Sequence, residues 1–486
     1  MSETTTHPDG RVELVHPEAL EKSPHYNEDL APIPIARRTW TTWDYAALWI
    51  SMAHCIPTYL MASGLVGQKG MSWWQALLTI LIGNLIVLVP ILLNSHPGTK
   101  YGIPFPVFAR AAYGTIGSNL PALLRALIAC GWFGINAWIG GQALHTFFVA
   151  LFPGWKTLLG TFNSFPTTQW ISFALFWGLN ILIVFRGMEL VRRLERFAAP
   201  FVLVMTAVLV AWAINAAGGL GPIMDKPGLD AAAFWPVFIP ALTATIGFWS
   251  TLSLNMPDFT RFGRSQREQT IGQIVALPST MTLFAAMGIL ITSATVVIFK
   301  VPQGIDDPIV LGGMLGNRLV VGIAMFTIVI ATLAVNIAAN VVSPANDFAN
   351  TFPRHVDFKR GGLITGIIGT LMMPWELLKD ANRYFQWLNG YSGALGAVAG
   401  VLIVDYWLIR KTVLDLPALY TPDGTYRYRN GWNLPAVIAT VVGATVALLG
   451  FFWPAMHPIY DWAWFVGFGL AGGLYWILMR GRANLA

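Results

Sequence analysis

The strongest constraint on this chain is a series of apolar stretches, each about as long as a membrane-crossing helix. Such a helix needs about twenty apolar residues to cross the roughly 30 Å hydrocarbon core of a bilayer. The sequence has twelve such stretches, at about 42–66, 73–94, 119–151, 167–186, 195–217, 234–255, 271–299, 317–344, 361–378, 384–409, 433–453 and 460–480. Because lipid offers no hydrogen-bond partners to the backbone, each stretch is predicted to be a helix.

The composition excludes whole classes of protein. Only 11% of the 486 residues are charged and 55% are hydrophobic, whereas about 25% charged residues is usual in a soluble domain. The chain is therefore predicted to be an all-α polytopic membrane protein, and not a soluble enzyme, a disordered scaffold or a nucleic-acid-binding protein. Cys55 and Cys130 lie in apolar stretches and form neither a disulfide framework nor a metal-binding pattern, so we expect no metal. Hydrolase and phosphate-binding motifs are absent as well, so we expect no enzyme.

Lys and Arg are divided unevenly between alternate connections. One set of loops and tails is rich in both residues, whereas the other set contains only Lys69, Lys156, Lys226, Lys300, Arg318, Lys379 and Arg383. Basic loops stay on the cytoplasmic side, so both termini are predicted to be cytoplasmic in a plasma (inner) membrane protein. The first forty residues are polar and lack the apolar core of a signal peptide.

Two predicted helices show the same local pattern. Trp49 precedes Pro57 by eight residues, and Trp249 precedes Pro257 by eight. Paired interrupted segments in corresponding halves indicate a transporter site near the membrane midplane. A proline near a helix end is common, however, so coincidence is the alternative.

The first predicted helix is expected to break near Pro57. Proline lacks a backbone N–H, and its ring clashes with the carbonyl four residues earlier, at Ala53. Carbonyl groups freed at membrane depth must be surrounded by protein or by a water-filled cavity. One interpretation of the break is therefore a pair of half-helix ends that face a ligand. The other interpretation is a simple packing kink. His54, beside this break, is the best mid-membrane titratable group, because no Asp or Glu lies at the centre of a span. A neutral His54 bonded to a freed carbonyl is the structural alternative.

Indole and amide side chains recur on three other helices. Trp132 and Asn136 are four residues apart and share a helix face, as do Asn336 and Asn340. Phe248 and Trp249 lie on the sixth predicted helix. An indole supplies a flat stacking surface, and an amide supplies one donor and one acceptor for a heterocycle edge. Ordinary interhelical hydrogen bonding is the alternative.

At these residues the sequence resembles the nucleobase:cation symporter-1 family, the permeases for cytosine, purines, uracil, thiamine, allantoin and hydantoins. The segments that carry the resemblance are residues 27–30 (NEDL), 38–40 (RTW), 55–59 (CIPTY), 98–105 (GTKYGIPF), 132–134 (WFG), 257–261 (PDFTR), 340–345 (NVVSPA) and 405–407 (DYW). The nearest likeness is to bacterial allantoin and uracil permeases. The resemblance implies twelve transmembrane helices in a LeuT-like 5+5 inverted repeat plus two C-terminal helices, with helices 1 and 6 interrupted. The implied units are a cytosolic tail at 1–40, repeats at 41–217 and 231–411, and two further helices at 430–480.

The resemblance also implies a substrate pocket. Trp132 and Trp249 match tryptophans that enclose the substrate ring, and Asn340 matches an asparagine that binds its amide edge. Asn136 stands where hydantoin-type relatives have Gln, Cys55 where relatives have Gln or Asn, and Phe248 where they have Gly. Helix 10, around residues 389–393, matches a thin gate.

The sodium site implied by the resemblance is degenerate. Ser51, His54 and Ala331 could supply carbonyl oxygens, but Ala334 and Val335 occupy the two hydroxyl positions. A hard cation needs oxygen ligands, which Ala and Val side chains lack. We therefore expect a proton as the coupling ion, with His54 as the candidate carrier.

Together these features predict a secondary transporter that imports a small planar cyclic amide or ureide by cation symport. Uracil is favoured over allantoin or hydantoin because Phe248 and two tryptophans suit a flat ring. The alternatives are a sodium-coupled allantoin or hydantoin permease and a substrate receptor that does not transport; for a channel, no filter is recognisable. We expect a monomer in the lipid bilayer, with no nucleic-acid partner and no cofactor beyond the coupling ion.

Overall fold

The computed structural model describes residues 4–378 and 381–481. Lys379 and the side chain of Arg383, which belong to the less basic set of connections, lie outside the described part. The helices are α1 (Thr42–Ala53), α2 (Ile56–Gly67), α3 (Trp73–Tyr101), α4 (Phe105–Tyr113), α5 (Asn119–Leu151), α6 (Thr167–Phe185), α7 (Met188–Ala217), α8 (Ala231–Trp249), α9 (Leu252–Asn255), α10 (Pro257–Thr260), α11 (Gln266–Ile298), α12 (Pro308–Gly313), α13 (Arg318–Asn340), α14 (Val342–Thr351), α15 (Phe358–Leu371), α16 (Pro374–Leu377), α17 (Ala381–Ile403), α18 (Leu434–Phe452), α19 (His457–Asp461) and α20 (Ala463–Met479).

Within the described residues, nine helices are long and apolar enough to cross a membrane, with α13 and α14 taken as one. The count rises to ten if α19 and α20, which meet at 79°, form one broken span. The two remaining predicted stretches contain shorter helices. The stretch at 42–66 is divided into α1 and α2, and the stretch at 361–378 holds α15, which ends at Leu371, and the short α16.

The division between α1 and α2 follows from the local sequence. His54 leaves the helical conformation (φ −82°, ψ 66°), and Cys55 is extended (φ −129°, ψ 154°). Pro57 then lies in the first turn of α2, where its missing N–H leaves no helical hydrogen bond unmade. A second, milder discontinuity lies between α8, which ends at Trp249, and α9, which begins at Leu252: Ser250 and Thr251 belong to neither helix but keep right-handed helical dihedrals.

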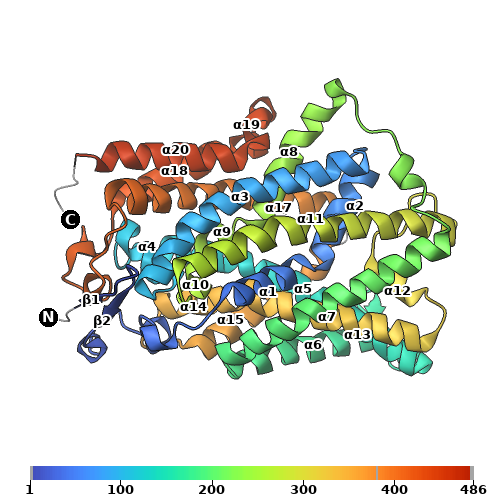
Figure 1. Ribbon diagram of the computed structural model, residues 1–486, viewed down its shortest axis with the longest axis horizontal. Helices are drawn as coiled ribbons and strands as arrows, with labels where there is room; N and C mark the ends of the chain where they lie inside the picture. The colour runs from blue at the N-terminus through green and yellow to red at the C-terminus, as the bar shows by residue number, and fades with distance from the viewer. Residues whose placement is uncertain (1–3, 379–380, 482–486) are drawn as a thin grey trace.

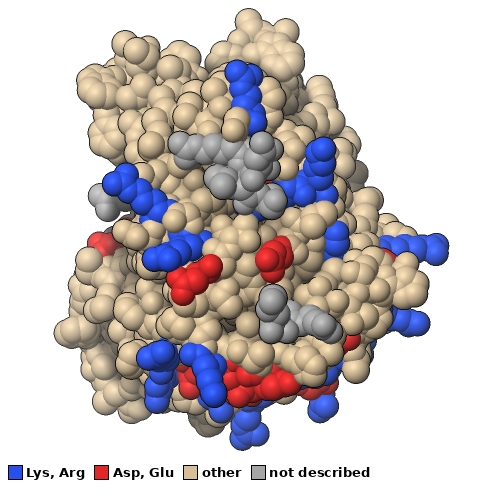
Figure 2. Space-filling model, turned by 90° about the vertical axis from the view of Figure 1, so that its left-hand side faces the viewer, with Lys and Arg blue, Asp and Glu red and all other residues tan. Residues whose placement is uncertain are grey.

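The long helices run along the long axis of the molecule, and both chain ends lie at the same end of the bundle (Figure 1). The short antiparallel ribbon of β1 (Thr4–Thr6) and β2 (Val12–Leu14) lies at that end, with Thr4 opposite Leu14. A second ribbon pairs β3 (Thr161–Phe162) with β4 (Phe165–Pro166). Lys, Arg, Asp and Glu side chains gather on the end that carries the termini (Figure 2).

Helices far apart in the sequence pack against one another. α5 packs against α13 and α6, and α1 packs against α11 and α7, whereas α17, α18 and α20 pack on one another. On α7 the apolar side chains of Val204 and Val208 are exposed. Exposed apolar side chains on a long helix are typical of a lipid-facing surface.

Candidate functional site

A small cavity lies where the two discontinuities meet α5 and α13. It has a volume of about 20 Å³, which is room for about one water molecule. Its lining comes from six helices (α1, α2, α5, α8, α9 and α13) and the breaks beside them: Met52, Cys55, Pro57, Trp132, Asn136, Phe248, Trp249, Thr251, Leu252, Val335, Ala339 and Asn340. All six residues predicted to bind substrate, together with Val335, therefore line one cavity.

Trp132 forms one wall of this cavity and is held by α17. Its indole N–H donates a hydrogen bond to the Tyr391 hydroxyl at 3.2 Å. The Trp387 ring meets it edge to face, with centroids 5.0 Å apart. α17, which contains the predicted gate segment 389–393, thus orients the indole that the sequence predicts to stack on substrate.

Phe248 is the side chain that fills the space between the two tryptophans. Its ring centroid lies 5.2 Å from that of Trp132 and 4.9 Å from that of Trp249, with T-shaped geometry in both pairs. Trp249 in turn meets Trp49 of α1 edge to face at 5.2 Å. The Phe248 ring therefore contacts both of the indoles that the sequence predicts to enclose substrate.

Two lining residues carry buried polar atoms that lack a partner within the described chain. The Asn136 side chain donates to the Trp132 carbonyl at 3.1 Å, but its Oδ1 accepts no hydrogen bond, and the Trp249 indole N–H donates none. Unpaired buried polar groups are costly. One acceptor and one donor among the lining residues match an amide edge, which offers an N–H and a C=O.

Asn340 belongs to a chain of buried amides. Its Nδ2 donates to Asn336 Oδ1 at 3.0 Å, and Asn336 Nδ2 donates to Asn180 Oδ1 at 3.1 Å. Asn180, on α6, donates to the Phe176 carbonyl one turn earlier. Asn180 was not among the predicted site residues, although an amide within an apolar stretch was the available signal. This chain fixes the orientation of Asn340 at the cavity.

The residues predicted for ion coupling do not form a single cluster around the cavity. His54 lies at the end of α1, where its Nδ1 donates to the Ile50 carbonyl at 2.9 Å and its ring packs on Phe284 at 4.3 Å between centroids. Ala331, Ala334 and Val335 are buried on α13, but of these only Val335 lines the cavity. The Ser51 hydroxyl points to α7 and donates to the Glu195 carbonyl at 3.3 Å.

Glu195 was not among the predicted site residues. Its side chain is buried, with 3% of the residue exposed. In sequence it stands between Arg193 and Arg196, which resembles a solvated helix end. The signal available was its position at the start of an apolar stretch, facing inward with Val191 and Ala199.

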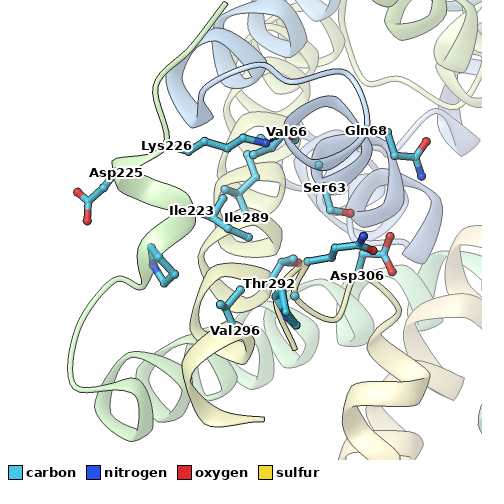
Figure 3. Close-up of a pocket in the computed structure, with 15 residues that line it drawn as sticks. Ser63, Val66, Gln68, Ile223, Asp225, Lys226, Ile289, Thr292, Val296 and Asp306 are labelled. Carbon is cyan, nitrogen blue, oxygen red and sulfur yellow. Dashed lines mark hydrogen bonds between the residues drawn. The ribbon is translucent and has the colours of Figure 1, made fainter. Parts of the chain in front are cut away.

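A larger cavity lies elsewhere in the described structure. It has a volume of about 680 Å³ and is bounded by the end of α2, the loop around Pro222–Asp225, α11 and the loop before α12. In this cavity Lys226 reaches toward Val66 and donates to its carbonyl at 3.2 Å, whereas Asp225 points outward (Figure 3). None of the predicted site residues lines it. The described residues contain no group of three or more His, Cys, Asp or Glu side chains placed to hold a metal ion.

The break between α1 and α2 and the aromatic-lined cavity beside it are typical of one class of protein: a multi-pass membrane transporter with a central site for a small ligand. A solved structure of Mhp1, a nucleobase-cation-symport-1 family transporter in a closed conformation with bromovinylhydantoin bound, matches with a TM-score of 0.77 and 26% identity. That match covers 94% of this chain and 96% of the other. A Na⁺-coupled sialic acid symporter shares the fold, with a TM-score of 0.64 and 14% identity over 93% of this chain and 91% of that one.

Sequence comparison identifies the family. The model for permeases of cytosine/purines, uracil, thiamine and allantoin matches residues 32–467. An allantoin permease of Bacillus subtilis (strain 168) is 42% identical over 459 residues, which cover 93% of each chain. A purine-uracil permease of Arabidopsis thaliana is 42% identical over 475 residues, covering 93% of this chain and 77% of the other. The chain belongs to the nucleobase:cation symporter-1 family, as its sequence motifs predicted, and this family consists of permeases and not enzymes.

Proposed function

We propose that this protein imports a small, flat cyclic amide, with uracil preferred to allantoin or hydantoin, by symport with a proton. The observation that carries the proposal is the cavity lined by Trp132 and Trp249, with the unpaired Asn136 Oδ1 and Trp249 N–H on residues that line it. Two indoles offer stacking faces and the two polar atoms fit an amide edge. Cys55 and Asn340 complete the lining.

The preference for a flat ring is argued from Phe248. Uracil needs only a thin slot between aromatic faces. Allantoin carries an additional ureide arm, which needs more space and further polar partners than Cys55 and Val335 provide. The related permeases include proteins named for allantoin and for purines and uracil, so substrate choice within this site depends on its few variable positions.

Proton coupling is argued from the residues on α1 and α13. Ala334 and Val335 carry no side-chain oxygen, and Ser51 turns its hydroxyl to α7. Few oxygens then remain for a sodium ion beyond backbone carbonyls. His54 is the carrier that the sequence predicts, and Ser51 and Ala331 remain as backbone contributors to the degenerate site.

The membrane arrangement that we propose has twelve spans, built as two five-helix repeats and two further helices, with the protein acting as a monomer. α1 and α2 together count as one interrupted span, α8 to α10 as another, and α15 as the ninth. Both termini are assigned to the cytoplasm, because the end that carries them is rich in Lys and Arg (Figure 2).

The test is uptake of labelled uracil into proteoliposomes under an imposed proton gradient and, separately, a sodium gradient. Unlabelled allantoin, hydantoin and cytosine serve as competitors. We expect proton-driven uptake that uracil blocks best. Stronger competition by allantoin or hydantoin would overturn the substrate ranking, and sodium-driven uptake would overturn the coupling ion. Binding without uptake in either gradient would favour a receptor.

A further inference from the structure

We propose that the Glu195 carboxyl group is the proton-binding site that couples transport to the proton gradient. This inference rests on the proton coupling proposed above, and it replaces His54 as the carrier. It concerns the seam between α1 and α7, a part of the molecule that does not touch the substrate cavity except through α1.

The Glu195 side chain is enclosed without a countercharge. Both of its carboxylate oxygens are buried and have no hydrogen-bond partner among the described residues. An ionised carboxylate in this position would lose its hydration with no countercharge and only the nearby Ser51 hydroxyl to compensate, which costs several kcal/mol. A carboxylic acid avoids most of that cost. Glu195 is therefore protonated in the closed arrangement described here.

The charged groups on the surrounding helices do not neutralise the Glu195 carboxylate. On α7 itself, Arg192 and Arg196 bind Asp44, and Arg193 binds Glu189 at the surface. α1 carries Asp44 and Tyr45, α11 carries Arg267 and Glu268 in its first turn, and α13 carries Arg318 at its first residue. α6 carries no charged residue. Across the described chain, no ion pair joins any of these groups to Glu195.

The surroundings of Glu195 depend on the position of α1. Ser51 lies three residues before the break at His54, and its hydroxyl donates to the backbone carbonyl of Glu195 at 3.3 Å. Ala47, Ile50 and Ala199 pack together on the same seam. Any motion of α1 that opens the substrate cavity therefore changes the surroundings of this carboxyl group.

The exit for the proton is closed by an adjacent ion-pair cluster. Arg192 and Arg196 each make two hydrogen bonds to the buried Asp44 carboxylate, at 2.6 to 3.0 Å. Arg192 precedes Glu195 by three residues and so lies on the same face of α7. When α7 separates from α1, this cluster opens and water reaches Glu195. The acid O–H bond then breaks, the proton passes to water on the terminus-bearing side, and the carboxylate stays hydrated until the seam closes again.

His54 is not a free proton-binding group of the kind described for Glu195. Its Nδ1 is occupied by the Ile50 carbonyl of its own helix, and its ring is packed against Phe284. It has no carboxylate partner in the described structure that would favour a charged imidazolium. Its role is to end α1.

The transport experiment compares the wild-type protein with Glu195→Gln and Glu189→Gln in proteoliposomes. Gln has the size of protonated Glu but cannot release a proton. Glu189 lies on the same helix but is exposed, with its carboxylate bound to Arg193. Each protein is assayed for accumulation of labelled uracil under a pH gradient and for exchange of labelled against unlabelled uracil without a gradient. If either allantoin or hydantoin proves to be the substrate, it replaces uracil.

We expect Glu195→Gln to lose at least about ten-fold in pH-driven accumulation while it keeps exchange, which also shows that it is folded. Glu189→Gln should accumulate like the wild type. Accumulation by Glu195→Gln at the wild-type level would overturn the inference. Loss of accumulation in His54→Gln, with Glu195→Gln unaffected, would return the role to His54.

An infrared measurement separates this inference from the proposed function. A protonated buried carboxyl group gives a carbonyl-stretch band distinct from that of carboxylates. We expect that band at neutral pH in the wild type and in Glu189→Gln, and the loss of the Glu195 contribution to it in Glu195→Gln; Asp347, whose carboxyl oxygens are also buried and unpaired, contributes to the same band in all three proteins. If the wild type shows no proton-driven uptake but loses the Glu195 contribution on this substitution, the proposed coupling fails and Glu195 still binds a proton. If the band does not change with Glu195→Gln, the inference is wrong whatever drives uptake.

Discussion

The rings of Trp132 and Phe248 meet edge to face across the central cavity, with centroids 5.2 Å apart. The two residues lie on α5 and α8, and the pair leaves a space of only about 20 Å³. In the function proposed above a substrate ring stacks on Trp132, so Phe248 must move before that ring can bind. Phe248 and a substrate ring therefore compete for contact with the Trp132 indole.

Replacement of Phe248 by Ala should widen the site. We expect weaker discrimination between flat and branched ligands, with allantoin competing about ten-fold better relative to uracil, which corresponds to about 1.4 kcal/mol. The buried ring also stabilises the fold, so the variant should lose about 3–5 kcal/mol of folding free energy. Competition binding on purified protein checks the first effect and thermal unfolding the second. An unchanged ratio of affinities would show that Phe248 does not face the ligand.

Replacement of Trp132 by Ala should remove one stacking surface. By analogy with base–aromatic stacking, the loss is about 1–3 kcal/mol of binding free energy. The control is Trp138→Ala, because Trp138 is an equally buried indole on the same helix that packs on Trp170 and Trp375 and does not line the cavity. Equilibrium binding of labelled uracil to the folded fraction measures both. Equal losses in the two variants would indicate a general packing effect.

Asn136 offers a test of the amide-edge interpretation. Asn136→Leu keeps the approximate volume but removes the unpaired Oδ1, and we expect it to weaken binding by about 0.5–1.5 kcal/mol, the usual contribution of a hydrogen bond. Asn84 on α3 is a close match: it is buried, donates to the carbonyl one turn earlier, and also has an unpaired Oδ1. Asn84→Leu should leave affinity unchanged, since Asn84 lies outside the cavity. Normal binding by Asn136→Leu would contradict the predicted contact.

The tail provides a pH-dependent contact outside the membrane. Burial and the nearby Arg110 guanidinium lower the pKa of His25 from 6.5 to about 4, so the folded protein holds this imidazole neutral while the unfolded chain protonates it. The resulting stability is present above pH 6.5 and is lost as the pH falls toward 4. His25→Asn should reduce the dependence of the melting temperature on pH over this interval. His16→Asn, at an exposed position, should leave that dependence unchanged. A parallel decline in all three proteins would exclude His25 as the cause.

Most of the helical framework was predictable because each span carries its own signal. The apolar stretch at 73–94 appears as α3, although the helix continues through Pro97 to Tyr101 and ends only at Gly102, which is left-handed. Pro57 located the first discontinuity to within three residues, because a proline acts on its own turn. The pocket residues came from local spacing and from the family resemblance.

The remaining features depend on contacts between helices far apart in sequence. Glu195 follows two arginines, and the packing of α7 on α1 turns its side chain inward while Arg192 and Arg196 reach Asp44. Asn180 is one polar residue in an apolar stretch until α6 meets α13. In the same way, no sequence pattern indicates that Phe248 fills the space between the two indoles.

The Asp44 cluster leads to the last prediction. Asp44→Asn keeps the side-chain volume but leaves the guanidinium groups of Arg192 and Arg196 without a countercharge, so the seam between α1 and α7 should open more often. Loss of a buried ion pair costs about 3–5 kcal/mol, and the value here should be smaller because the Arg196 side chain is 43% exposed.

Opening of this seam can be followed at Ala47, which is fully buried there. In a background without Cys55 and Cys130, Ala47→Cys should react with a maleimide at least several-fold faster when Asp44 is replaced by Asn. Asp423→Asn removes an exposed ion pair with Arg427 and serves as the control, with no change expected. An equal labelling rate with and without Asp44 would show that the cluster does not hold the seam closed, and water would then need another route to Glu195.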